Sequence, residues 1–312
     1  MEHLSPQFLN IDADRQGQRI DNFLFSQLKT IPKSRIYRAL RGGEIRVNKK
    51  RVKADYRLQA ADMVRLPPFK METTTPTIVR NHEFAPLLAR IIYEDEDLLV
   101  LNKPAGMPVH GGTNTSFGVI DALRQARPEN KALELVHRLD KGTSGCLIIA
   151  KKRSALKYLH ELMRESQVEK EYLCLVKGVW PEGGKRHVKV ALKKNILQSG
   201  ERMVRVDATG KEAHTEFTVV ERFKNCSLIK ARLHTGRTHQ IRVHLEHIGY
   251  PLVGDDKYGD WEFTKQLRTH TGLKRMFLHA QQISFKLPNS DKTITVAAPL
   301  DRDLAQCLQK LI

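Results

Sequence analysis

The sequence of 312 residues has little cysteine and no long apolar segment. Its four cysteines, Cys146, Cys174, Cys226 and Cys307, form no C-x-x-C pair, and their gaps match no zinc-binding spacing. Three of them lie in apolar runs, as is typical of small packed side chains in a reducing compartment, so the sequence predicts a cytoplasmic protein. No apolar run approaches the roughly twenty residues of a membrane span. The N-terminus also lacks the basic-then-apolar order of a signal peptide.

Acidic residues are outnumbered by basic ones. Lys and Arg number 53 against 35 Asp and Glu, a formal net charge of +18, while 40% of the residues are hydrophobic. That hydrophobic share is enough for a sizeable core. A positive excess this large favours a polyanionic partner, nucleic acid first and an anionic membrane second, and the lack of any membrane-binding segment leaves nucleic acid. The alternative is that the charge serves solubility alone.

Residues 18 to 68 have the pattern of a small unit of two helices and short strands. Apolar residues three and four apart predict a helix from Ile20 to Leu28, and a second helix is expected from about Lys33 to Arg41. The segment IRVNKKRVK predicts a hairpin about Asn48 and Lys49, and DMVRLPP predicts a closing strand.

The second helix and the hairpin are strongly basic. Between residues 33 and 57 there are ten Lys and Arg and two acids. Helical spacing places Arg35, Arg38 and Arg41 on one face, and the hairpin adds Lys49 and Lys50. A surface of this kind neutralises phosphates with little regard to base sequence, so these five residues are the predicted RNA contacts. An ordinary solvated helix face is the alternative, although such a face would normally mix both signs.

The rest of the chain is rich in strands. Residues 69–86, with many Thr and Pro, are expected to be a linker. Residues 87–312 show apolar strand-like runs interrupted by helical patterns, one of them capped by Thr238, without regular βαβ alternation. The predicted fold class is therefore α+β with a mostly antiparallel sheet.

Two loops could hold a chemical site. The stretch NKPAGMPVHGG, 102–112, predicts a rigid turn that can approach a ligand closely, but it lacks the spacing and the Lys-Ser/Thr of a P-loop. The stretch HRLDKGTSG, 137–145, places one carboxylate, Asp140, in a turn between two apolar segments. Asp140 could be a turn residue, half of a surface ion pair or a nucleophile. Gly142 and Gly145 would allow close backbone approach, and Thr143 and Ser144 could hydrogen-bond locally.

A third stretch, LHTGRTHQIRVHLEHIG, 233–249, contains His234, His239 and His244 at every fifth position. On a helix, His239 and His244 would lie about 140° apart, which does not suit joint metal ligation. We interpret the three histidines as packing or RNA-contacting residues and expect no metal site. Arg242 is expected to share a helix face with His239.

The motifs in this order resemble a known family. The stretches KPAGMPVHG, HRLDKGTSG, EKEYLCLV and GRTHQIRVH together are similar to those of the RluA-type pseudouridine synthases. The N-terminal stretches RIDNFL and SRIYRALRGGEIRVN resemble an S4-type RNA-binding domain. The resemblance implies a small α/β S4-like domain over residues 15–68, a linker over 69–86, and a catalytic domain with the pseudouridine synthase fold over 87–312.

The resemblance also implies a reaction and the residues that perform it. The expected activity is isomerisation of uridines in large-subunit ribosomal RNA, with no cofactor or metal. Asp140 is implied to be the essential carboxylate, as a nucleophile toward the ribose or as a base, and Arg242 its ion-pair partner. Tyr172 is implied to pack on the uracil and to help remove the C5 proton. Arg138, His137 and Leu278 are the expected substrate contacts.

Two rival functions stay open at the level of sequence. One is a non-enzymatic RNA-binding or ribosome-assembly factor that keeps the fold. The other is a nucleoside hydrolase or glycosylase, which typically needs a second acid or a metal near the first, and none appears in the three motifs. Nothing in the sequence indicates an obligate dimer, so we expect a monomer whose partner is ribosomal RNA.

Overall fold

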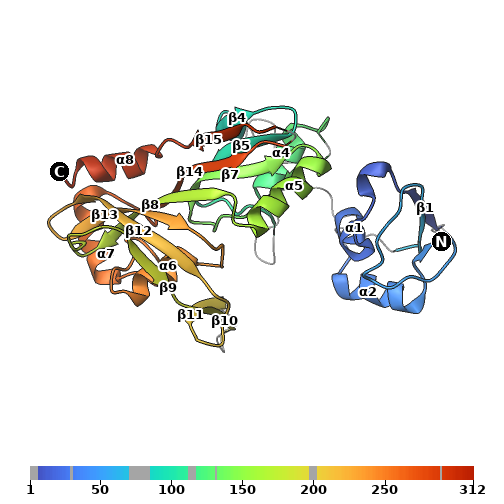
Figure 1. Ribbon diagram of the computed structural model, residues 1–312, viewed down its shortest axis with the longest axis horizontal. Helices are drawn as coiled ribbons and strands as arrows, with labels where there is room; N and C mark the ends of the chain where they lie inside the picture. The colour runs from blue at the N-terminus through green and yellow to red at the C-terminus, as the bar shows by residue number, and fades with distance from the viewer. Residues whose placement is uncertain are drawn as a thin grey trace. The chain divides into compact units, whose positions relative to one another are not determined.

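The computed structural model describes residues 6–28, 31–69, 85–111, 117–130, 132–196, 202–288 and 290–312. The chain divides into two compact units, Met1–Arg80 and Asn81–Ile312, and each is treated by itself (Figure 1). Most of the expected linker, residues 70–84, lies outside the described residues.

The N-terminal unit combines a three-stranded antiparallel sheet with two helices. Its elements are β1 (Gln7–Asn10), a 3-10 helix (Ala13–Arg15), α1 (Ile20–Gln27), α2 (Lys33–Gly42), β2 (Arg46–Val47) and β3 (Met63–Leu66). The sheet order is β1-β3-β2, so the unit includes a strand before the residue 15 boundary expected from the sequence. Both predicted helices and the closing strand are present.

The helices form as the pattern predicts, but the hairpin does not. Ile20 and Ile36 are fully buried in one core, and α2 ends at Gly43, whose φ of 70° is left-handed. Asn48 and Lys49 form the expected tight turn with positive φ. Beyond that turn residues 51–53 form no strand, and β2 pairs instead with β3.

The second unit contains a ten-stranded mixed sheet and a separate β10-β11 hairpin. The strands of the long sheet are β4 (Ile91–Glu94), β5 (Leu98–Lys103), β6 (Glu134–Leu135), β7 (Ser144–Ala150), β8 (Glu169–Lys177), β9 (Arg186–Lys189), β12 (His214–Arg222), β13 (Cys226–Leu233), β14 (Leu278–Lys286) and β15 (Thr293–Ala297). Their main order is β4-β5-β7-β14-β8-β13-β12-β9, with β15 paired to β14 and β6 to β7. All pairs are antiparallel except β7 with β14, which confirms the predicted α+β class.

Helices pack against this sheet and bury its apolar side chains (Figure 1). The helices are α3 (Ala85–Leu88), α4 (Val119–Ala126), α5 (Arg153–Arg164), α6 (Gln240–His247), α7 (Trp261–Thr271) and α8 (Arg302–Gln309), and the hairpin joins β10 (Leu192–Ile196) to β11 (Arg202–Val206). Leu159 of α5 packs with Leu98 and Ile148 of β5 and β7. Leu267 and Leu304 of α7 and α8 pack with β8 and β13. No described helix is both long and apolar enough to cross a bilayer.

The parallel contact between β7 and β14 fixes the end of the HRLDKGTSG stretch. Gly145 pairs with Ala280 and has a φ of +108°. A Cβ at this position would lie 2.2 Å from the Ala280 carbonyl oxygen, so only glycine fits. The prediction for Gly145 is therefore right, whereas a Cβ on Gly142 would make only an ordinary contact with Met276.

Candidate active site

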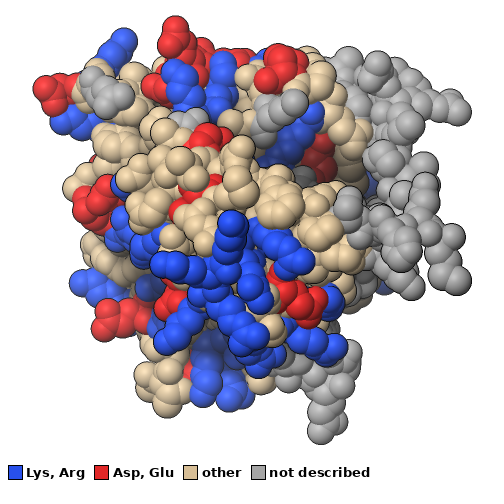
Figure 2. Space-filling model, turned by 90° about the vertical axis from the view of Figure 1, so that its right-hand side faces the viewer, with Lys and Arg blue, Asp and Glu red and all other residues tan. Residues whose placement is uncertain are grey.

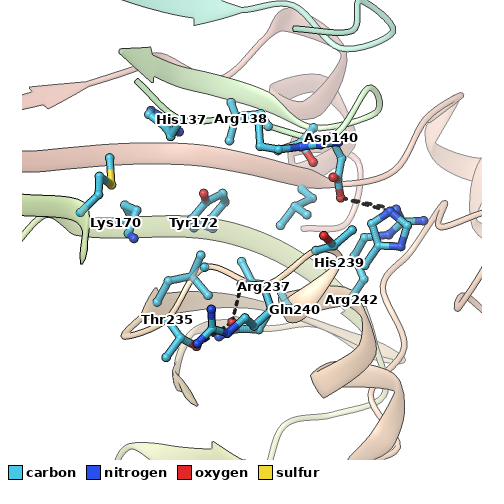
Figure 3. A pocket seen from close by; sticks show the side chains of 18 of the residues that line it. His137, Arg138, Asp140, Lys170, Tyr172, Thr235, Arg237, His239, Gln240 and Arg242 are labelled. Atoms are coloured by element: carbon cyan, nitrogen blue, oxygen red, sulfur yellow. Dashed lines mark hydrogen bonds and ion pairs between the residues drawn. The ribbon is translucent and has the colours of Figure 1, made fainter. Parts of the chain in front are cut away.

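A cavity of about 690 Å³ opens in the second unit and is lined by the loop after β6, strand β8 and the segment from Leu233 to Arg242 (Figure 3). All six site residues that the sequence predicts for the reaction line it: Asp140, Tyr172, Arg242, Arg138, His137 and Leu278. Some of these residues lie more than a hundred positions apart in the sequence, so it is the fold that brings them together.

Lys103 contacts the loop that bears Asp140 from the protein interior. The Thr143 amide donates to the Asp140 carbonyl, which closes a tight turn. The fully buried Lys103 amine donates to the carbonyls of Pro104 and Met107 at 2.8 Å and of Lys141 at 3.3 Å. Burial lowers the pKa of Lys103 to about 7. The KPAG turn thus anchors the Asp140 loop, a role of this lysine that its sequence context did not indicate.

Ser144 fixes the other end of the loop through distant partners. Its hydroxyl hydrogen-bonds to His279 Nδ1 at 2.8 Å and accepts from Arg275 at 2.9 Å. Burial lowers the pKa of His279, so the ring is neutral at pH 7. The expected local hydrogen bond of Ser144 is wrong, because β14 pairs with β7 at this residue and brings His279 within hydrogen-bond distance.

Arg242 faces Asp140 but is held mainly by Asp255. Its Nε and Nη2 atoms donate to the Asp255 carboxylate at 2.7 and 2.6 Å, and the Asp255 side chain is fully buried. The remaining nitrogen, Nη1, lies 3.6 Å from Asp140 Oδ2. The bidentate pair orients the guanidinium and leaves one edge for Asp140. Burial would raise the pKa of Asp255, but the hydrogen bond and charge of Arg242 outweigh it and keep this pKa below its usual value.

His239 is the second neighbour of Asp140 and was not predicted as such. Its Nε2 lies 3.8 Å from Asp140 Oδ2, and its Nδ1 hydrogen-bonds to the Tyr258 hydroxyl at 2.9 Å. His239 has a φ of 54°, a left-handed backbone that costs energy in a residue other than glycine. It is the residue at the N-cap position of α6, so the predicted cap at Thr238 is wrong. Burial lowers the pKa of His239, which favours the neutral ring.

Strand β8 presents Tyr172 and Lys170 to the cavity, two residues apart on one face (Figure 3). Tyr172 is 7% exposed, and burial followed by the charge of Asp140 raises its pKa, so the phenol keeps its proton. Burial lowers the pKa of Lys170. The strand alternation around Tyr172 could have indicated Lys170 from the sequence.

The remaining predicted contacts lie on the walls and at the rim. Leu278 is buried at the start of β14. His137 accepts the Ile148 amide on its Nε2 at 3.1 Å, and burial lowers its pKa to about 3, so the ring is neutral. Arg138 is exposed at the cavity edge.

The rim opposite Asp140 is a hydrogen-bonded loop built around Gln240. The Gln240 side chain accepts from the Thr235 hydroxyl at 2.7 Å and from the Arg237 amide at 3.0 Å (Figure 3). It also donates to the His214 carbonyl at 3.0 Å. This buried amide fixes the turn from β13 into α6, and with it the direction of His239 and Arg242.

Lys and Arg side chains gather on the face of the molecule that Figure 2 shows, and those predicted on the N-terminal unit differ in their surroundings. Arg35 is half-buried, donates to Glu44 at 3.1 and 2.6 Å and stacks on Phe69, so its charge is already paired. Arg38 and Arg41 are exposed and line a hollow of about 790 Å³. The basic side chains of the hollow are Arg38, Arg41, Arg51 and Lys53, a set called the basic hollow below. Lys49 and Lys50 are exposed on the turn and do not line it.

Comparison with known proteins extends these observations. Residues 97–247 match the family described as RNA pseudouridylate synthase, and residues 18–64 match the S4 domain family. The sequence is 52% identical to ribosomal large subunit pseudouridine synthase C of Escherichia coli and 53% identical to that of Salmonella typhimurium, each covering 98% of this chain and 97% of the relative. The fold is similar to human RNA pseudouridylate synthase domain containing 4, with a TM-score of 0.62 and 26% identity over 74% of this chain and 96% of that one.

Proposed function

Because this chain belongs to the RNA pseudouridylate synthase family, we propose that it isomerises specific uridines of large-subunit ribosomal RNA to pseudouridine, with Asp140 as the essential carboxylate. The observation that carries the proposal is the single carboxylate of Asp140, 22% exposed to a cavity, with a fixed Arg242 at 3.6 Å and a buried phenol on the opposite wall. Relatives at about half identity are named as synthases acting on the ribosomal large subunit.

The cavity size fits one nucleoside. A volume of about 690 Å³ lies within the usual range for small-ligand sites. A uracil inside a stacked or paired segment cannot reach the floor of such a cavity, so the nucleotide must leave its stack. Arg138 lies at the cavity edge, and we assign it to holding the flipped nucleotide; we assign Leu278 and Tyr172 to apolar contact with the base.

The reaction exchanges one glycosidic bond for another. The bond from C1′ to N1 breaks, the uracil turns, and C5 bonds to C1′; the C5 proton leaves and N1 gains one, so no other atom is required. Asp140 acts either as a nucleophile on C1′ or as a base at the 2′ position, and both roles need the ionised form. Arg242 is the cation beside that carboxylate, with its Nη1 atom 3.6 Å from Asp140 Oδ2.

Tyr172 acts as a protonated phenol. Its raised pKa disfavours a phenolate in the resting site. We assign it to stacking against the uracil and to relaying the C5 proton after C5 has bonded to C1′, with the phenol passing its own proton on as it takes that one. Lys170, on the same face of β8, is placed beside this path.

The N-terminal unit supplies RNA affinity. We assign phosphate contacts to the basic hollow and to the exposed Lys49 and Lys50 of the neighbouring turn, whereas Arg35 is assigned to packing against Glu44 and Phe69. Phosphate contacts of this kind position a strand without reading its bases.

We also propose that the protein acts as a monomer in the cytoplasm. Every residue assigned to the reaction comes from one chain, so the cavity needs no second copy. All four cysteines are free and buried, which suits a reducing compartment.

Tritium release from ribosomal RNA labelled at uracil C5 tests the proposal. Release of more than one equivalent of tritium per enzyme molecule, with no loss of uracil from the RNA, is the expected result. Tight RNA binding without tritium release would favour the binding-factor alternative. Release of free uracil would favour a glycosylase.

A further inference from the structure

Three histidines gather outside the cavity on one face of the sheet. His187 lies on β9, His214 begins β12 and His234 directly follows β13. The strand register brings them together: His187 is paired with Glu216, which lies two residues after His214, and the His234 amide donates to the His214 carbonyl at 3.1 Å. Residues paired across antiparallel strands, and residues two apart on one strand, share a sheet face. The four side chains therefore project together from a rigid platform.

The distances within this group are short. One nitrogen from each imidazole can be chosen so that all three lie within 4.8 Å of one another. His187 Nδ1 lies 3.0 Å from His214 Nε2, and the His214 and His234 rings stack at 4.1 Å. Glu216 Oε2 lies 3.6 Å from His234 Nε2 and 4.0 Å from His187 Nε2.

The group is not used by the proposed reaction, and one of its atoms lacks a hydrogen bond. His234 Nε2 is buried and has no hydrogen-bond partner among the described residues. A buried imidazole nitrogen left in this way is unfavourable unless something binds it. Glu216 is 8% exposed, and its other oxygen, Oε1, is paired with Lys185 at 2.9 Å, so Oε2 is the atom turned to the histidines.

We propose that His187, His214 and His234 bind one divalent zinc ion, beside the carboxylate of Glu216. Three imidazoles are a favourable donor set for zinc. Zn–N bonds of about 2.0 to 2.1 Å in a tetrahedral site separate neighbouring ligand atoms by about 3.3 Å. The distance of 3.0 Å between His187 Nδ1 and His214 Nε2 is close to that value. The His214 and His234 rings stack face to face, so one of them must turn to point a nitrogen at the shared ion.

The ion would be structural. β9 is the last strand in the main order of the sheet, and His187 would tie it to β12 and to the end of β13. The next residue after His234 is Thr235, whose hydroxyl accepts the His214 amide at 2.9 Å and donates to Gln240. The zinc site thus lies directly behind the rim of the cavity and would stiffen the loop that directs His239 and Arg242.

Direct metal binding by the tag-free, full-length protein tests this inference. After treatment with a chelator, the protein is titrated with Zn²⁺ against a chromophoric competitor, and Co²⁺ absorption reports the ligand geometry. We expect one Zn²⁺ per chain and a tetrahedral Co²⁺ spectrum. His187 is exposed, so His187→Gln should fold normally and weaken Zn²⁺ affinity at least tenfold, as should His234→Gln.

His247→Gln, at an exposed position of α6, is the matched control and should bind Zn²⁺ like the wild type. Circular dichroism establishes that each variant is folded. The inference is overturned if the wild type binds Zn²⁺ only at millimolar concentrations, or if folded His187→Gln and His234→Gln bind it as tightly as the control.

Discussion

The two units use arginine in opposite ways. In the cavity, Arg242 is 5% exposed and two of its nitrogens are occupied by a buried carboxylate, so its position is fixed before any substrate arrives. In the N-terminal unit, Arg38 and Arg41 are exposed beside a hollow. A catalytic carboxylate needs a cation at a constant place, whereas a phosphate backbone needs cations that can adjust to it.

Arg35 lies in the N-terminal unit, but its surroundings resemble those of Arg242. It is half-buried and forms a bidentate ion pair with Glu44. Its spacing from Arg38 and Arg41 gave no sign of this, since helix periodicity places a side chain on a face but does not name its partner across the fold.

The largest effect is expected from Arg242→Met, which removes the cation beside Asp140. Activity should fall at least a hundredfold, and stability should fall by about 3–5 kcal/mol because Asp255 would be left buried and unpaired. Tritium release and denaturant unfolding measure the two effects.

The double variant Arg242→Met with Asp255→Asn separates the roles of this arginine. It should recover much of the lost stability, because the buried charge is gone, but none of the activity. Recovery of activity along with stability would mean that Arg242 serves folding alone.

Lys103→Met should have the next largest effect, since it removes the amine that holds the Asp140 loop. The carbonyls of Pro104 and Met107 lose their donor, while that of Lys141 keeps the Gly106 amide, so we expect a loss of about 2–3 kcal/mol in stability and about a tenfold fall in kcat. Lys141→Met is the control, because the Lys141 side chain is exposed and only its carbonyl contacts Lys103. Equal behaviour of the two variants would exclude the anchoring role.

A smaller effect concerns pH. Burial lowers the pKa of His137 to about 3 and of His244 to about 4, so both rings are neutral in the folded protein at pH 5 to 6.5. In the unfolded chain these histidines bind protons below their ordinary pKa of about 6.5. Their contribution to the free energy of unfolding is therefore fully present above pH 6.5 and is lost as the pH falls. Between pH 6.5 and 5 we expect a loss of about 1–3 kcal/mol.

Unfolding in urea across this pH range measures the decline. His244→Gln should flatten it, and His247→Gln, on the exposed side of the same helix, should not. A slope that is identical in both variants would assign the decline to other groups.

The smallest effect tests the N-terminal half of the comparison. Each side chain that no longer neutralises a phosphate of single-stranded RNA lowers the salt slope of binding by roughly 0.7, so Arg38→Gln with Arg41→Gln should lower it by about 1.4. Arg35→Gln should leave the slope nearly unchanged, because its charge is already paired with Glu44. RNA binding across a salt series is the measurement. A larger change for Arg35 than for the pair would reverse the assignment.

The sequence predicted what depends on local pattern or on a shared motif. Helices α1 and α2, the mostly antiparallel class and the joint presence of Asp140, Tyr172 and Arg242 in one cavity follow from periodicity and from the family resemblance. The positional need for Gly145 was also foreseen, since a glycine in this turn indicates close backbone approach.

What the sequence did not predict depends on contacts across the fold. Asp255 pairs with Arg242, Lys103 reaches the loop of Asp140, and His234 meets two strands distant in sequence. Thr238 has the residue type of a helix cap, but the backbone at His239 turns left-handed, and a propensity rule cannot foresee that a hydrogen bond to Tyr258 accompanies such a turn.

The central claim is that the isomerisation requires the ionised carboxylate of Asp140, whereas the basic hollow contributes only to RNA binding. Asp140→Asn keeps the size of the side chain and removes the charge, so it tests this claim most directly. Tritium release from C5-labelled ribosomal RNA should fall to background while RNA affinity and its salt slope stay within about twofold of the wild type. Release within tenfold of the wild type by the folded variant would contradict the account.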